Sequence, residues 1–328
     1  MIRVKSVQIN RFRGIREGAV RDFADVNLLV GRNNSGKSTV VEAVHRVAAA
    51  AADNSADAIG RRLEVWTTAR SEVNPLIAEI WYTLDQSEPI TISAEIGKAE
   101  LDKSETVVLT IAIQGNRQTY HGTLNFQDKA GLGRDEIIQF LGRATVFRPE
   151  DARNLNIERA LWQKIIGPRH DKALTQALNT IFNQNADSYS LLPDGKVWLL
   201  FPKYSVPLDS QGDGNRAALR CLTMLTVLRR TLFTAEEIEC HQHPGSLSSF
   251  AKALCKQAKE QEVQLFLPTQ SAECVRAFLA ASAEAGAESA VFHLKLDHGV
   301  LDTTRLAPEA AQTLLDTGVD VRFLDLYD

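Results

Sequence analysis

The sequence contains no apolar run long enough to cross a membrane. Its longest apolar stretch, 40–52, is interrupted by Glu42, His45 and Arg46, whereas a spanning helix needs about 20 apolar residues. The first 14 residues also lack an apolar core followed by a small-residue cleavage site, and they resemble an edge strand instead. We therefore expect a cytoplasmic protein without a membrane partner.

Cysteine pairs and a strong net charge are also lacking. The four cysteines lie far apart and form no CxxC pair, which argues against a zinc knuckle or a disulfide framework. The formal net charge is −4 at pH 7, so contact with DNA would depend on local basic patches or on a partner. With 328 residues and 44% hydrophobic content, the chain is long enough for one large domain or two modest ones.

A complete phosphate-binding loop is present near the N-terminus. The apolar run 26–30 ends at Gly31, and an alanine-rich segment of helical composition follows Lys37. This order of strand, loop and helix exposes backbone N–H groups to phosphate at a helix N-terminus. Lys37 would reach the β and γ phosphates of ATP, and Ser38 would offer a hydroxyl to Mg²⁺. The residues expected to bind ATP here are Gly31, Arg32, Asn33, Asn34, Ser35, Gly36, Lys37, Ser38 and Thr39.

The remaining pattern divides the chain into four segments. We expect an N-terminal part of the nucleotide-binding core at 1–75, an antiparallel β insert at 76–130, a helical lobe at 131–190 and a C-terminal part of the core at 191–328. The strand-like runs are 77–84, 89–96, 106–113, 117–126, 196–204, 263–267 and 290–296. The helix-like runs are 135–142, 157–167, 171–183, 215–231, 247–260 and 277–290.

Four motifs in a fixed order resemble a known superfamily. They are RFRGI at 11–15, GRNNSGKST at 31–39, SQGDGNR at 210–216 and EEIECHQHP at 236–244. Together they resemble the ABC-type ATPases related to RecF, the heads of SMC proteins and the overcoming-lysogenization nucleases, over roughly residues 1–50 and 195–275. The resemblance implies an α/β ABC-ATPase head with a mixed β-sheet core, an antiparallel β insert and a helical lobe.

The resemblance also implies a dimer. In relatives, the signature loop caps the γ phosphate bound to the other subunit, and Ser210 and Gly212 occupy that loop here. A serine hydroxyl and glycine N–H groups at a helix N-terminus are consistent with an anion site. A plain turn is the alternative interpretation, because Ser, Gly and Asp are common in turns. The resemblance therefore implies a homodimer held through ATP and the signature loop.

Two positions depart from the family pattern and bear on catalysis. Glu236 stands where relatives carry the aspartate that orients the Mg²⁺ shell, and its extra methylene displaces the carboxylate by about 1.5 Å. Glu237 matches the general base, although both acids would also suit a solvated helix start. Gln270 replaces a histidine that contacts the γ phosphate, and glutamine cannot become a cation. With two positions altered, we expect slow or absent ATP turnover.

Weaker signals lie at both ends of the motif set. The resemblance places Arg13, with Arg11, against the nucleotide or DNA, and an exposed edge-strand role is the alternative. Cys240, His241 and His243 invite a metal interpretation, but no fourth zinc ligand is evident. The favoured interpretation is that His243, followed by proline, belongs to the loop that crosses the dimer interface in relatives.

The function expected from these residues is that of an ATPase working with a separate effector, a nuclease or toxin, in bacterial anti-phage defence. The 58 residues after Gln270, 271–328, are too few for a further nuclease domain of the Toprim type, so we expect nuclease activity to belong to a partner. A RecF-like DNA-repair ATPase in a nucleic-acid complex, an ATP-binding scaffold without turnover and a transporter ATPase are the alternatives. The transporter is the least favoured of them.

Overall fold

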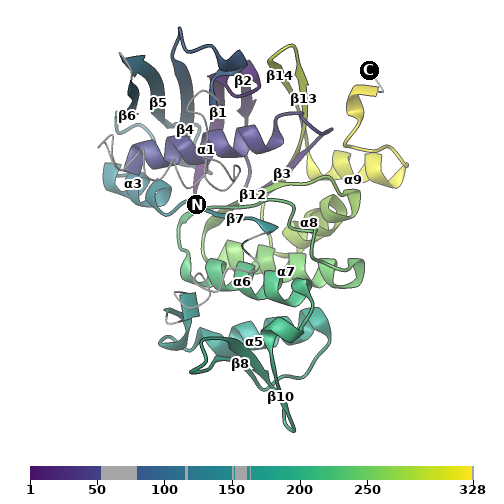
Figure 1. Ribbon diagram of the computed structural model, residues 1–328. Helices are drawn as coiled ribbons and strands as arrows, with labels where there is room; N and C mark the ends of the chain where they lie inside the picture. The colour runs from purple at the N-terminus through teal and green to yellow at the C-terminus, as the bar shows by residue number, and fades with distance from the viewer. Residues whose placement is uncertain (53–79, 115–116, 150, 152–160, 163, 327–328) are drawn as a thin grey trace.

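The fold is built on one large mixed sheet (Figure 1). The computed structural model describes residues 1–52, 80–114, 117–149, 151, 161–162 and 164–326. Among these residues the sheet has eleven strands in the order β6-β5-β4-β1-β2-β14-β13-β3-β12-β11-β7. The strands are β1 (Ile2–Phe12), β2 (Ile15–Arg21), β3 (Val26–Val30), β4 (Ile90–Lys98), β5 (Glu105–Gln114), β6 (Arg117–Asn125), β7 (Thr145–Phe147), β11 (Thr231–Ala235), β12 (Val263–Pro268), β13 (Ser289–Asp297) and β14 (Val300–Leu306).

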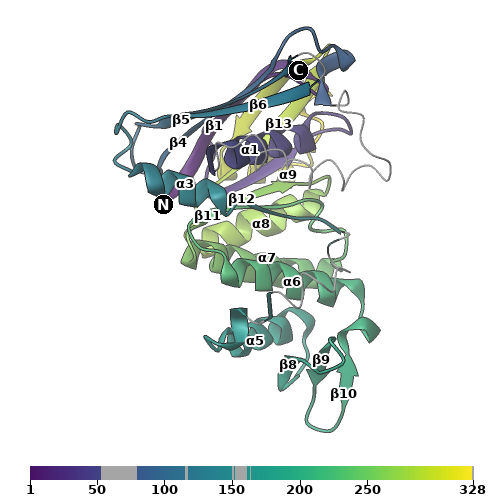
Figure 2. The same ribbon diagram turned by 60° about the vertical axis from the view of Figure 1, so that its left-hand side comes forward.

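Helices cover both faces of this sheet, and a small sheet lies below them. The helices are α1 (Lys37–Ala52), α3 (Arg134–Gly142), α5 (His170–Phe182), α6 (Asp213–Val227), α7 (Pro244–Glu260), α8 (Ala272–Glu284) and α9 (Pro308–Asp316), with short 3-10 turns η2 (Tyr82–Leu84), η4 (Leu208–Ser210) and η5 (Leu324–Leu326). The small antiparallel sheet contains β8 (Ser188–Leu191), β9 (Val197–Leu200) and β10 (Ser205–Pro207). Figure 2 shows it at the far end of the molecule from the large sheet.

The central strand β3 shows why the core divides into two halves. Its side chains alternate across the sheet, so Val26, Leu28 and Val30 pack into the core formed with α5 to α9, whereas Leu29 packs into the core formed with α1 and α3. All five residues of β3 are buried. A strand buried on both faces holds the loop that follows it on a rigid support.

The antiparallel strands extend the core sheet. The expected strands at 89–96, 106–113 and 117–126 are present as β4, β5 and β6, and β4 pairs with β1 from Ile2 opposite Lys98 to Asn10 opposite Thr91. The interpretation of the N-terminus as an edge strand is therefore wrong, because β1 lies between β4 and β2. Its second neighbour comes from a distant part of the chain, which local alternation does not reveal.

Other boundaries differ from the pattern of the sequence. In the expected strand 77–84, the described residues form a bridge at Trp81 and the turn η2, because Thr83 and Leu84 adopt positive φ. The helix expected at 277–290 is α8, which starts at Ala272 after the N-cap Ser271 and ends at Glu284. The hydroxyl of Ser271 accepts the N–H of Cys274. The helix expected at 215–231 ends at Val227. Of the expected helix 157–167, residues 161–162 and 164–166 are helical, whereas 157–160 and 163 lie outside the described residues.

The expected lobe 131–190 divides between two places. Helix α3 packs beside α1, where Ile137, Phe140 and Leu141 join the core of the antiparallel strands. Helix α5 and the small sheet join α6 and α7 in the other core. The phenol of Tyr189 in β8 donates to Asn215 Oδ1 in α6 at 2.9 Å. None of the described helices is long and apolar enough to cross a membrane.

Candidate nucleotide-binding site

The glycine-rich loop joins β3 to α1 in a conformation that only glycine adopts without strain. Gly31 has φ 140°, and a Cβ there would lie 2.4 Å from the carbonyl oxygen of Leu294 on β13. Gly36 has φ 93°, and Asn34 is also left-handed at φ 63°. The backbone thus turns sharply over β13 and enters α1 at Lys37, which leaves the first N–H groups of the helix at the loop.

Lys37 lies folded over this loop. Its Nζ donates to the carbonyl oxygens of Gly31 at 2.8 Å and Arg32 at 2.7 Å. Burial lowers the pKa of Lys37, and the nearby Glu237 carboxylate partly opposes that shift. Lys37 as a residue is only 9% exposed, so its ammonium group is held close against the loop carbonyl oxygens.

The loop forms one wall of a pocket of about 790 Å³. From the loop and α1, residues 33–39 line it; the remaining lining residues are Pro149, Glu236, Glu237, Pro268, Thr269 and Gln270. The pocket therefore brings together the expected ATP-binding residues Asn33 to Thr39, the expected metal ligands Ser38 and Glu236, and the expected catalytic residues Glu237 and Gln270. Gly31 and Arg32 belong to the loop but lie outside the lining.

Both acids of the pocket follow the end of β11. The N–H of Glu236 donates to the carbonyl oxygen of Phe147 on the neighbouring β7 at 3.0 Å, and Arg148 Nε lies 3.8 Å from Glu236 Oε2. Glu237 has φ 44° and is exposed. The left-handed region is unfavourable for a residue other than glycine, and such a conformation persists only where the surrounding structure imposes it. The turn thus holds the Glu237 carboxylate at the mouth of the pocket.

The loop after β12 is tied to the same acidic turn. Glu239 accepts hydrogen bonds from the hydroxyl of Thr269 and from the N–H of Gln270, the latter at 3.3 Å. These links were missed by sequence reasoning, although Glu239 is the third acid of the EEIE motif. Arg322 donates to the carbonyl oxygen of Gln270 from the C-terminal side.

The C-terminal turn also reaches the phosphate loop. Arg32 lies 3.3 Å from the carboxylate of Asp325, and its guanidinium group stacks over Phe323 with 5.7 Å to the ring centroid. Because Arg322 contacts Gln270 in the same turn, residues 320–326 connect the loop before α1 with the loop after β12. Arg32 is thus held by the protein itself, outside the pocket lining.

Arg13 pairs with a buried acid on α1. Arg13 Nε lies 2.7 Å from Glu42, a fully buried carboxylate that also pairs with Arg46 at 2.6 Å. Arg11 pairs with Asp85 at 2.5 Å. The alternative of an exposed edge-strand role is wrong for Arg11, because β1 is an interior strand. Arg13 follows the end of β1 and is tied to the buried Glu42.

Ser210 and Gly212 lie apart from the pocket within one chain. Ser210 ends η4, where its hydroxyl donates to the carbonyl oxygen of Pro207 at 2.7 Å, and Gly212 caps the N-terminus of α6. A Cβ at Gly212 would have no atom within 4 Å, so the backbone there is openly accessible. His243 accepts from the N–H of Gly245 and caps α7, and His241 contacts the carbonyl oxygen of Pro149 at 3.2 Å.

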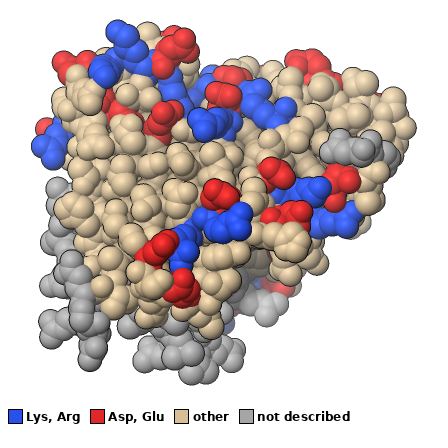
Figure 3. Space-filling model, turned by 90° about the horizontal axis from the view of Figure 1, so that it is seen from above, with Lys and Arg blue, Asp and Glu red and all other residues tan. Residues whose placement is uncertain are grey.

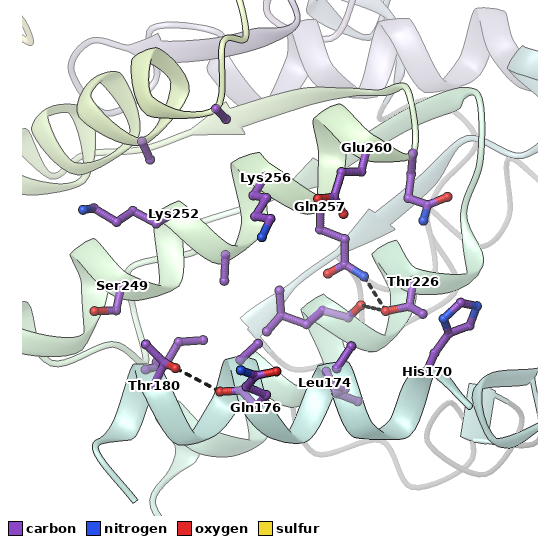
Figure 4. A pocket seen from close by; sticks show the side chains of 18 of the residues that line it. His170, Leu174, Gln176, Thr180, Thr226, Ser249, Lys252, Lys256, Gln257 and Glu260 are labelled. Carbon is purple, nitrogen blue, oxygen red and sulfur yellow. Dashed lines mark hydrogen bonds between the residues drawn. The ribbon is translucent and has the colours of Figure 1, made fainter. Parts of the chain in front are cut away.

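A second hollow lies between α5, α7 and their neighbours (Figure 4) and has a volume of about 570 Å³. Helix α7 carries Lys256 on one side, and α5 carries Gln176 on the other. Lys252 at its rim pairs with Glu284 at 2.8 Å. Its lining comes entirely from helices and their ends, without the loop amides that phosphate binding requires, so the pocket beside α1 is the candidate nucleotide site.

The donors in the pocket suit magnesium bound together with nucleotide phosphates. Ser38 and Glu236 line the pocket together with Lys37 and carry oxygen atoms, and Mg²⁺ is typically held by one or two protein oxygens, water and phosphate oxygens. Within the described residues, no group of three or more His, Cys, Asp or Glu side chains is arranged to hold a metal ion by itself. This donor set fits a metal that arrives with the nucleotide.

A strand, a glycine-rich loop and a helix N-terminus facing two acids define a P-loop nucleotide-binding protein. The family model described as "AAA ATPase domain" matches residues 2–186, more than half of the chain, and the chain belongs to this family. Membership in this family of ATPase domains implies nucleotide binding, usually with Mg²⁺.

Two relatives match about a third of the chain. Over 112 residues it is 27% identical to "Uncharacterized protein MJECL11" of Methanocaldococcus jannaschii, a match that covers 34% of this chain and 98% of that protein. It is 30% identical over 112 residues to an "ATP/GTP phosphatase" of Helicobacter pylori, covering 33% of this chain and 27% of that protein. The match therefore spans only about a quarter of the H. pylori protein.

Solved SMC heads share the fold over nearly the whole chain. An SMC head bound to the C-winged helix domain of ScpA matches with a TM-score of 0.61 and 15% identity, covering 94% of this chain and 99% of that one. The SMC head domain from Thermotoga maritima matches with a TM-score of 0.55 and 13% identity, covering 93% and 99%. These similarities confirm the predicted ABC-ATPase head as the fold.

Proposed function

We propose that this chain is an ABC-type ATPase head that forms an ATP-bridged homodimer, hydrolyses ATP slowly and acts with a separate effector in bacterial anti-phage defence. The observation that carries the proposal is the pocket in which the phosphate loop, Glu236, Glu237 and Gln270 meet. It contains the phosphate-binding and hydrolytic positions of the resemblance, whereas the signature residues of the same chain lie elsewhere.

Several pocket residues have a defined role in this proposal. The loop amides of 33–38 and the Lys37 ammonium bind the phosphates, and Ser38 and Glu236 hold magnesium, which neutralises phosphate charge when it is bound. Glu237 orients the attacking water as general base. Gln270 donates a hydrogen bond to the γ phosphate but brings no positive charge. A missing preorganised donor typically lowers a rate by about 100 to 1,000-fold, which is the basis for slow turnover.

The dimer is supported by where the signature residues lie. Ser210 and Gly212 sit at the N-terminus of α6, where helix N–H groups attract anions. The open backbone at Gly212 leaves room for a ligand held by another molecule. A second copy would supply this turn to the γ phosphate, as the resemblance to ABC-type ATPases implies.

The effector and the defence role rest on the resemblance. One of the structurally similar SMC heads is bound to a domain of a separate protein, ScpA, which is a precedent for a head of this fold that holds a partner. On the face shown in Figure 3, basic side chains lie next to acidic ones and large areas are uncharged. Direct nucleic-acid binding through that face has little electrostatic support.

Sedimentation velocity with and without ATP tests the dimer. We expect ATP and Mg²⁺ to convert wild type to a dimer and Ser210→Arg to remain a monomer, because arginine adds bulk and charge at the proposed interface. Ser87→Arg, at an exposed serine before β4 and far in sequence from the signature and His243 loops, is the matched control and should dimerise. The same assembly in all samples would contradict the ATP-bridged dimer. In a separate experiment, purification of the protein from its native operon would identify the effector among the co-eluting components.

A further inference from the structure

Glu236 poses a geometric problem for the proposed magnesium site. Its carboxylate is one methylene farther from the backbone than that of an aspartate, a displacement of about 1.5 Å in a site whose ligand distances are 2.0–2.1 Å. A freely extended Glu236 would therefore disturb the metal shell. Some other group must hold this side chain back if the site binds magnesium well.

Arg148 lies where its side chain can hold the Glu236 carboxylate back. It follows the end of β7, and Glu236 follows the end of the neighbouring parallel strand β11. The N–H of Arg148 donates to Asp151 Oδ2 at 2.9 Å, which fixes the backbone of the turn. The two side chains thus leave adjacent strand ends, and Arg148 Nε approaches Glu236 Oε2 to 3.8 Å.

The Arg148 guanidinium is buried behind the pocket. The arginine side chain is 6% exposed and that of Glu236 is 14% exposed. Arg148 itself is not among the lining residues, although Pro149 beside it is. Its positive charge therefore lies beside Glu236 but outside the lining of the pocket.

The surroundings of Arg148 favour Glu236 as the group that its charge attracts. His45 on α1 forms a hydrogen bond with Thr234, with 2.9 Å between His45 Nε2 and Thr234 Oγ1. Burial, and then the charge of Arg148, lower the pKa of His45 to about 3, so this histidine is neutral near pH 7. A neutral imidazole adds no second positive charge near Glu236, and the ion pair of Glu236 with the buried guanidinium is screened far less than a surface pair.

We propose that Arg148 is a positioning residue that draws the Glu236 carboxylate back by its ion pair, so that the longer acid serves the magnesium shell in place of an aspartate. This inference rests on the proposed function, because it concerns the metal of the same ATP site. It leaves Gln270, rather than Glu236, as the cause of slow turnover. It also assigns a role to the segment after β7, which none of the sequence motifs covers.

The test is the coupling between magnesium and nucleotide binding, measured without reference to turnover. Affinity for a non-hydrolysable ATP analogue is determined by calorimetry in EDTA and in Mg²⁺, and the ratio gives the coupling. Substituting a partner that orients a metal ligand typically costs 10 to 100-fold in metal affinity. We expect Arg148→Gln to reduce the coupling by about 10-fold or more, with affinity in EDTA within about twofold of wild type.

Matched variants separate positioning from folding. Arg143→Gln removes an exposed arginine just before β7 and should leave the coupling unchanged. Arg148→Lys keeps the charge but loses the planar guanidinium fork, and it should lie between wild type and Arg148→Gln, which also covers the case of a poorly folded Gln variant. In a Glu236→Gln background, Arg148→Gln should cause no further loss of coupling.

The outcomes distinguish this inference from the proposed function. If wild type binds the analogue with no preference for Mg²⁺, the proposed magnesium site fails. If wild type shows coupling that Arg148→Gln and Arg148→Lys leave unchanged, Arg148 has no positioning role. Stronger coupling in Arg148→Gln would also overturn the inference, because it would mean that Arg148 withholds Glu236 from the metal.

Discussion

The buried acid on the phosphate-loop helix offers a quantitative test of the structure. Glu42 on α1 is fully buried between Arg13, at 2.7 Å, and Arg46, at 2.6 Å. Glu42→Gln keeps the shape of the side chain but removes its charge, which leaves Arg46, 1% exposed, without this counter-charge. Removing one partner of a buried ion pair costs about 3–5 kcal/mol. That is a large part of the roughly 5–15 kcal/mol by which domains are stable.

Urea denaturation at pH 7 measures this loss. The control is Glu17→Gln, because Glu17 pairs with Arg16 on the surface, where the side chains are 59% and 47% exposed. Such exposed pairs contribute about 0–1 kcal/mol. A loss below about 1 kcal/mol for Glu42→Gln would refute the reasoning, since it would mean that the two guanidinium groups are stabilised without the carboxylate.

The pH dependence of the stability difference between wild type and Glu42→Gln has a direction that can also be predicted. Burial opposes ionisation of Glu42, but the charges of Arg46 and Arg13 outweigh it and lower the pKa of this carboxyl. A lowered pKa in the folded state stabilises the protein above the unfolded value, about 4.5, and this stabilisation is lost as pH falls through the folded pKa. The stability difference between wild type and Glu42→Gln should therefore be constant from about pH 6 to 8 and shrink below about pH 4.5.

Three further predictions concern the nucleotide pocket. Lys37→Ala should weaken ATP binding by about 100-fold or more, because each hydrogen bond from a charged group contributes about 1.5–3 kcal/mol; equal calorimetric affinities would refute the assignment. Gly31→Ala should weaken ATP binding at least about tenfold, because a Cβ would meet the Leu294 carbonyl oxygen at 2.4 Å; unchanged affinity would show that the loop adjusts. Gln270→His should raise phosphate release by about tenfold or more, and an equal or lower rate would exclude Gln270 as the cause of slow turnover.

The contiguous motifs were the part of the site that the sequence predicted well. The strand, the loop and the start of the helix around Lys37 all fall within the sixteen residues 26–41. Over so short a segment, local periodicity and glycine spacing are enough to predict the structure. The structure brings Glu236, Glu237 and Gln270 to this loop, as the family order implied. Their roles in binding and catalysis stay predictions until the variants are measured.

Contacts between distant segments were beyond the sequence pattern. The pairing of β1 with β4, which made the N-terminal strand an interior one, joins residues separated by the whole of 13–89. The ion pair between Arg148 and Glu236 depends on the parallel register of β7 and β11. No local period encodes which strand becomes the neighbour of another, so these features required the three-dimensional arrangement.

The position of β3 has a consequence for how the chain is made. This strand lies between β12 and β13, with Leu28 opposite both Leu267 and Val291. During synthesis the phosphate-loop strand must therefore wait for residues 263–297 before either of its edges is paired. Such non-local pairing is slow, and an open apolar strand is prone to aggregate. We expect nascent chains that stop before β12 to need a chaperone and to gain no protection from ATP.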